Sequence, residues 1–137
     1  MPAKLSPQEA LIYAMVTTSA VDRSMSDEEL ARIGSIVSQL PMFDGFNSDL
    51  LEVSKACGAL LSGDNGLNNV LDIIVKGLPA SQRETCYMLA LEVAAADLEV
   101  KDEEIRFLEL LADALDLDQL IVSALERGVK ARNQPVA

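Results

Sequence analysis

The spacing of apolar residues along the chain predicts helices and no strand. In the first segment Leu11, Met15 and Val16 follow helical spacing, which predicts an amphipathic helix. Its start is marked by Ser6, a proline in the first turn and Glu9, the residues of a capping box. A second capping box, from Ser26 to Glu29, opens the next helical pattern, which ends before a proline.

Glycine, proline and turn residues delimit the other predicted helices. These are expected at residues 49–61, 67–76, 79–96, 102–115 and 119–130, which makes about seven helices in all. Half of the 137 residues are apolar, enough for one folded core. We therefore expect an all-α, compact single-domain bundle over residues 1–137, with its core at about 6–130 and a flexible tail at 131–137.

Charge and residue types exclude several functions. Asp and Glu number 22 against 11 Lys and Arg, and a net charge of -11 disfavours nucleic acid as a partner. The chain has no His, which removes His-dependent catalysis and His-liganded zinc. Cys57 and Cys86 are expected to be reduced, unreactive core thiols. No enzyme activity is expected, and the lack of a run of about 20 apolar residues predicts a cytoplasmic protein without membrane insertion.

An internal repeat is the most informative feature of the sequence. Residues 20–30 and 95–105 match at an offset of 75, with five of eleven positions identical. Each copy reads as a helix, a short loop and a second helix. The repeat predicts two related helical hairpins, packed about a pseudo-two-fold axis with the third and fourth helices between them.

Each copy of the repeat carries an Asp after its first helix and a Glu seven residues later. These are Asp22 and Glu29 in the first copy, and Asp97 and Glu104 in the second. Carboxylates that converge in a short loop favour a hard cation, and without His or nearby thiols calcium or magnesium is expected. The loops are not EF-hands, because the twelfth position after each Asp is apolar.

A structural explanation of these carboxylates stays open beside the metal site. In the first copy Ser26 and Glu29 already form a capping box, and acidic first turns complement the helix dipole. In the second copy Lys101 stands at the capping position and cannot replace the serine. Capping therefore does not explain both copies, although Arg23 and Lys101 could neutralise the carboxylates as ion pairs.

The repeated motif resembles that of the TerB-like tellurite-resistance family over roughly residues 6–130. The matching positions are Ala20, Asp22 and Glu29, followed by Ala96, Asp97 and Glu104. Arg23 and Leu98 stand where that family usually has Gly. The resemblance implies a compact fold of about seven helices and a non-enzymatic, stress-associated protein that binds a divalent cation. It also implies protein partners, including a TerC-like membrane protein.

The alternative function is a metal-free interaction or scaffold module. Phe43 and Phe46, two of only three Phe, lie in a turn-rich segment and would form an apolar docking feature unless they pack beneath the loop. A homodimer is compatible with a bundle of this size, although no sustained heptad seam supports one. The segment Asp64–Asn69 is expected to be a turn and helix start and not a calcium loop.

Overall fold

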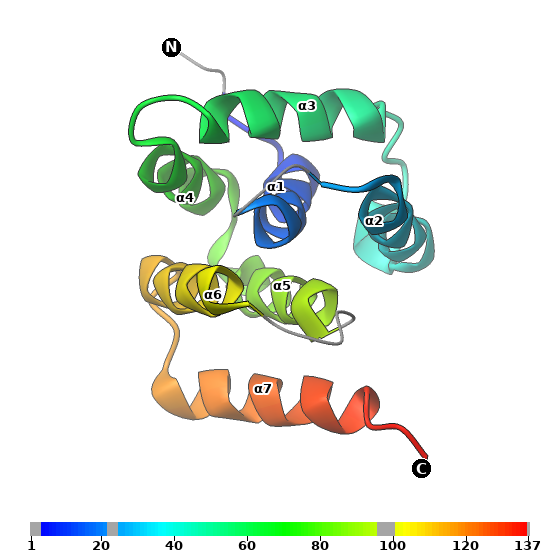
Figure 1. The fold of residues 1–137 in the computed structure, drawn as a ribbon, viewed down its shortest axis with the longest axis vertical. Coiled ribbons are helices and arrows are strands. Elements are labelled where there is room, and N and C mark those ends of the chain that lie inside the picture. The colour runs from blue at the N-terminus through cyan, green and yellow to red at the C-terminus, as the bar shows by residue number, and fades with distance from the viewer. Residues whose placement is uncertain (1–3, 22–24, 96–100, 137) are drawn as a thin grey trace.

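The computed structural model describes residues 4–21, 25–95 and 101–136, and this part of the chain contains helices and no strand (Figure 1). The prediction of an all-α fold is confirmed. Two short 3₁₀ helices, η1 (Pro41–Phe43) and η2 (Ala80–Gln82), lie between the α-helices. The α-helices are α1 (Pro7–Ala20), α2 (Asp27–Gln39), α3 (Leu50–Leu61), α4 (Gly66–Gly77), α5 (Arg83–Ala95), α6 (Asp102–Ala114) and α7 (Gln119–Arg132).

Helix α1 is the centre of the fold. It packs against α2, α3, α4, α5 and α6, and every residue from Ala10 to Ser19 is buried. The prediction of an amphipathic helix here is wrong, because a helix surrounded by other helices has no solvent-facing side to keep polar. Two hydroxyls in its last turns have partners: the Thr18 hydroxyl donates to the Ala14 carbonyl at 2.8 Å, and the Thr17 hydroxyl lies 3.4 Å from the Cys57 sulfur. The buried Ser19 hydroxyl has no hydrogen-bond partner among the described residues.

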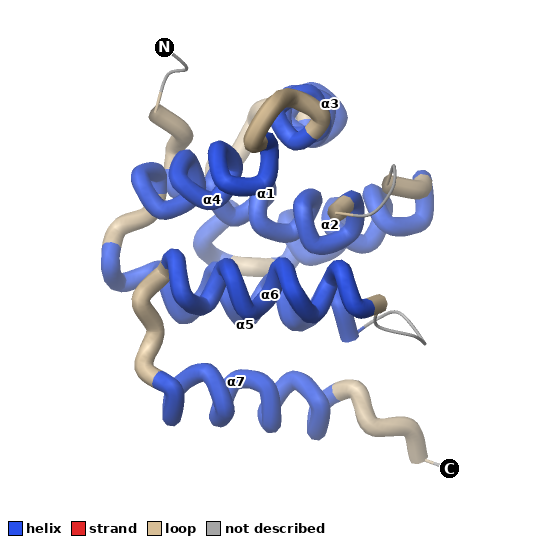
Figure 2. The backbone as a smooth tube through the Cα atoms, turned by 60° about the vertical axis from the view of Figure 1, so that its left-hand side comes forward, coloured by secondary structure: helices blue, strands red, loops and turns tan. Residues whose placement is uncertain are grey.

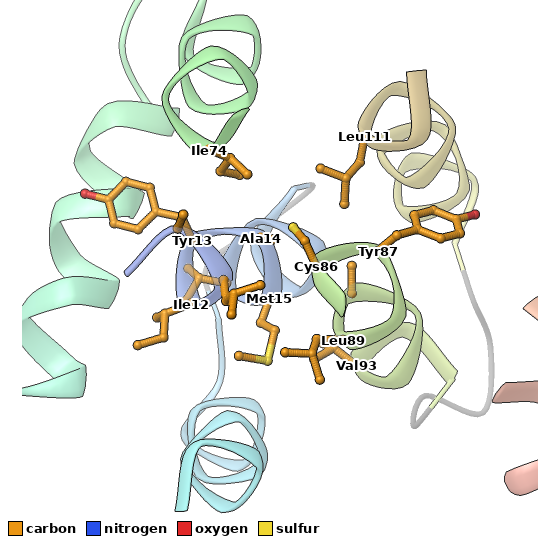
Figure 3. Close-up of a cluster of buried hydrophobic side chains, with 14 of the residues drawn as sticks. Ile12, Tyr13, Ala14, Met15, Ile74, Cys86, Tyr87, Leu89, Val93 and Leu111 are labelled. Carbon is orange, nitrogen blue, oxygen red and sulfur yellow. The ribbon is translucent and has the colours of Figure 1, made fainter. Parts of the chain in front are cut away.

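The helices form successive layers. Figure 1 shows α1 between α4 and α2, with α3 above them and α5 and α6 below, and Figure 2 shows α7 beyond α5 and α6. The core between α1 and α5 includes Ile12, Met15 and Leu89 (Figure 3). Because α1 and α5 contact each other directly, the expectation that the third and fourth helices separate the two hairpins is wrong.

The two predicted capping boxes are present at the starts of α1 and α2, and a side chain also caps the start of α3. Ser6 and Ser26 both form complete capping boxes, and Asp49 caps α3 by accepting a hydrogen bond from the Leu51 amide at 2.9 Å. The last helix differs, since it continues through residues 131 and 132, which we assigned to the tail. Asn133 ends it by donating from its side-chain amide to the Val129 carbonyl at 2.8 Å.

The offset of 75 residues reappears in the helix bounds. Helix α2 spans Asp27–Gln39 and α6 spans Asp102–Ala114, so these two helices coincide at both ends. The pseudo-two-fold axis stays a prediction, but the second helices of the two repeats have matching limits.

Candidate functional site

The first candidate loop leads into a well-capped helix start. The Ser26 hydroxyl accepts from the Glu29 amide at 3.1 Å, and a Glu29 carboxylate oxygen accepts from the Ser26 amide at 2.9 Å. Glu29 is only 6% exposed. The capping explanation is therefore confirmed for this copy, and it engages one of the two Glu29 oxygens.

The second loop leads into a helix start without that cap. Lys101 stands at the N-cap of α6 and makes no side-chain capping bond, as its residue type predicts. Glu104 is nevertheless 3% exposed, at the position equivalent to Glu29. Burying an ionised carboxylate costs free energy unless partners compensate it, and Glu104, like Glu29, has an interaction partner. The burial of this carboxylate thus recurs where a capping box does not account for it.

The two aspartates of the predicted metal site, Asp22 and Asp97, lie outside the described residues. The structure therefore places half of the predicted set: Glu29 at the start of α2 and Glu104 at the start of α6, each in its own helix–loop–helix unit. Within residues 4–21, 25–95 and 101–136, no three Cys, Asp or Glu side chains group closely enough to hold a metal ion.

The segment before α4 is a turn, as predicted. Asn65 adopts a left-handed conformation with φ of 56°, and the Asn69 side-chain amide donates to the Asp64 carbonyl at 3.2 Å. Helix α4 begins directly afterwards, at Gly66. The segment therefore connects α3 to α4. Its hydrogen bonds do not bring its carboxylate together with others.

The aromatic turn packs inward. Phe43 is buried, and its ring meets that of Phe46 edge to face, with 6.1 Å between the ring centroids. The Gln8 side-chain amide ties the turn to α1 by donating to the Met42 carbonyl at 2.9 Å and to the Asp44 carbonyl at 3.3 Å. The alternative that these aromatic residues pack beneath the loop is confirmed for Phe43, and this side chain is not available for docking.

Both cysteines are free and buried, as expected. Burial raises the pKa of the Cys57 thiol to about 11, against a smaller opposing effect of its hydrogen bond with Thr17. Burial also raises the pKa of the Cys86 thiol to about 12. The reactive thiolate is therefore scarce at neutral pH, and neither side chain has the features of a nucleophile or redox sensor.

A contact that the sequence did not predict fixes α7. The Tyr87 hydroxyl donates to the Glu126 carboxylate at 2.9 Å, and Arg132 lies 3.5 Å from the Glu92 carboxylate. Burial and the bond to Glu126 raise the pKa of Tyr87, so its hydroxyl keeps its proton and remains a donor. Tyr87 and Glu126 are 39 residues apart, so no local pattern in the sequence indicates that they form a hydrogen bond.

Of the comparisons with known proteins, one gives a match. None of the described helices is long and apolar enough to span a membrane. Searches of curated proteins and of solved structures found no match. The family model described as tellurite resistance protein TerB matches residues 8–126, most of the 137-residue chain, and the chain therefore belongs to the TerB family.

Proposed function

We propose that this TerB-family protein is a non-enzymatic module that binds a divalent cation, calcium or magnesium, at its two repeated loops. Asp22 and Glu29 supply carboxylates in the first loop, and Asp97 and Glu104 supply them in the second. Oxygen ligands from carboxylates suit these hard cations. The cellular role would be in tellurite resistance or a related stress response in the cytoplasm, with protein partners that include a TerC-like membrane protein.

The burial of Glu104 carries this proposal. A capping box accounts for the position of Glu29, but the start of α6 has no such box, and its glutamate is buried to the same degree. Cation binding at both loops would explain why a glutamate is buried at the start of each second helix. The non-enzymatic part is supported by the absence of His and by the two buried thiols with raised pKa values.

Titration calorimetry on chelator-treated protein tests the proposal. We expect saturable heat with calcium or magnesium, and we expect the variant Asp22→Ala/Asp97→Ala to bind at least about tenfold more weakly, because each loop loses an anionic ligand. Glu104→Gln should weaken the second loop while keeping the size of the side chain.

The matched control is Asp72→Ala/Asp113→Ala, which removes the same charge from two exposed positions. This control matters because a chain of net charge -11 attracts cations without any site. Equal heat from the loop variant and the control variant would refute the cation site. Silence of the parent protein would leave the metal-free interaction module as the function.

One observation favours the metal-free interaction module. Leu120, at the start of α7, is 80% exposed, although α7 packs on α5 through Val122 and Val129. A protein contact on this outer helix would cover Leu120 and remove its apolar surface from water. The interaction surface would then lie on α7 and not at the aromatic turn.

A further inference from the structure

A cavity opens where four helices approach one another. It lies between the end of α1, the start of α2, the middle of α3 and the start of α4, and has a volume of about 530 Å³. This volume falls within the range of small-molecule binding sites, which is roughly 300–1,000 Å³. The cavity is therefore large enough to hold a small ligand.

The lining of this cavity is mainly aliphatic, with a few polar groups. Most of the polar ones are hydroxyls, and the two charged residues, Lys55 and Asp27, have opposite signs. An apolar wall with a small number of polar groups is the usual composition of a ligand site. The main apolar lining residues are Val16, Ala20, Leu30, Leu51, Leu61 and Leu67.

Gly58 keeps space open in one wall. It lies inside α3, where glycine weakens a helix relative to alanine, and a Cβ atom built on it meets nothing within 4 Å. Close helix packing is thus not the reason for glycine here. A Cβ atom at this position would project from the cavity lining without a steric clash.

Ser54 supplies a polar group that nothing in the described structure satisfies. The residue lines the cavity and is 6% exposed, and its hydroxyl has no hydrogen-bond partner. Buried hydroxyls normally have a hydrogen-bond partner. The Ser54 hydroxyl, one helical turn from Gly58, has none, which indicates that a partner is missing. A ligand hydroxyl, which both donates and accepts, would satisfy it.

The repeat provides an internal comparison. A smaller cavity of about 310 Å³ lies beside α5 and α7, and several of its lining residues are those of the first cavity displaced by 75 positions. Lys130 corresponds to Lys55, but Val129 replaces Ser54 and Asn133 replaces Gly58. The unpaired hydroxyl and the open glycine therefore belong to the first cavity alone.

We propose that the first cavity binds a single-chain amphiphile with an uncharged hydroxyl head group. The aliphatic chain contacts the leucine-rich walls beside Gly58, and the head group pairs with Ser54. A neutral head is favoured because Lys55 and Asp27 offset each other at the lining, while the net charge of -11 disfavours an anion. Glu29, the described cation ligand of the first loop, does not line this cavity, and either proposal can fail without the other.

NMR titration of the chelator-treated full chain with 1-octanol, followed through backbone amides near Ser54, tests this proposal. We expect saturable shifts in the parent, binding at least about tenfold weaker in Gly58→Leu because the new side chain occupies the cavity, and binding severalfold weaker in Ser54→Ala. The matched control is Gly128→Leu, which also fills open space on a helical glycine but lies in α7.

Four results would overturn the proposal. These are no saturable shift in the parent, unchanged binding in Gly58→Leu, loss of binding in Gly128→Leu as well, or tighter binding of octanoate than of 1-octanol. Unchanged affinity in Ser54→Ala would refute the pairing of the head group with this hydroxyl. Circular dichroism of each variant establishes that it is folded, and folding is expected because neither glycine substitution meets an atom within 4 Å at Cβ.

Discussion

Replacing Phe107 with alanine should lower the free energy of unfolding by about 3–5 kcal/mol. Phe107 lies on α6, is fully buried and is among the largest such side chains in the core. The truncation removes apolar surface from the core and leaves a cavity that the neighbouring helices fill only in part. For a domain of ordinary stability this loss is a large share of the total.

Urea denaturation followed by circular dichroism measures this effect. The matched control is Leu120→Ala, an aliphatic truncation at a side chain that is 80% exposed, which should change stability by less than about 0.5 kcal/mol. A loss below about 1 kcal/mol for Phe107→Ala would contradict the packing of α6 described above.

The same substitution should have opposite effects at two glycines. Gly66→Ala is expected to cost about 3 kcal/mol, because its Cβ would lie 2.1 Å from the Leu61 carbonyl oxygen and 2.7 Å from that of Leu60. Both obstacles are backbone atoms at the end of α3, so relief requires that helix end to move. Gly58→Ala meets nothing and should stabilise the protein by about 0.5–1 kcal/mol through higher helix propensity.

Thermal and urea unfolding of the two alanine variants, measured side by side, check this pair. Changes of opposite sign in the free energy of unfolding would show that the effect at Gly66 is steric and not a general effect of replacing glycine. Destabilisation of similar size at both positions would show that the close approach of α4 to the end of α3 is not what requires Gly66.

Local signals in the sequence predicted most helix limits. Ser6 and Ser26 each provided a cap and a glutamate three residues later, and Pro41 stopped α2, so these boundaries depend on residues adjacent in the chain. The repeat likewise predicted that a helix would begin at Asp102, the position equivalent to Asp27. Such features are local, which is why a single sequence reveals them.

The tertiary arrangement of the helices was harder to predict from the sequence. The run from Ala10 to Ser19 reads as a helix, but its burial on all sides follows from the docking of five other helices and not from its own pattern. The 3₁₀ turn at residues 80–82 precedes α5, where we predicted one continuous helix from residue 79. The cavity beside Gly58 was also missed, because a lone helical glycine does not disclose whether its missing side chain leaves space or permits close packing.

For the candidate site, sequence reasoning identified the paired carboxylates but not their environment. The structure adds that Glu29 and Glu104 are both buried, a property that depends on how α2 and α6 meet the rest of the bundle. Acidic residues in a first turn are normally exposed, so composition alone predicts the opposite. Asp22 and Asp97, the other half of the set, lie outside the residues that the structure describes.

The most direct test of the cation proposal is an NMR titration of the chelator-treated parent with calcium and, separately, with magnesium, recorded on backbone amides across the chain. We predict saturable shifts confined to residues 20–30 and 95–105, because the proposed ligands lie in these two segments. Saturation with shifts in both segments would support one function for the two copies of the repeat. Shifts that never saturate, or that spread evenly over acidic surface positions, would contradict it.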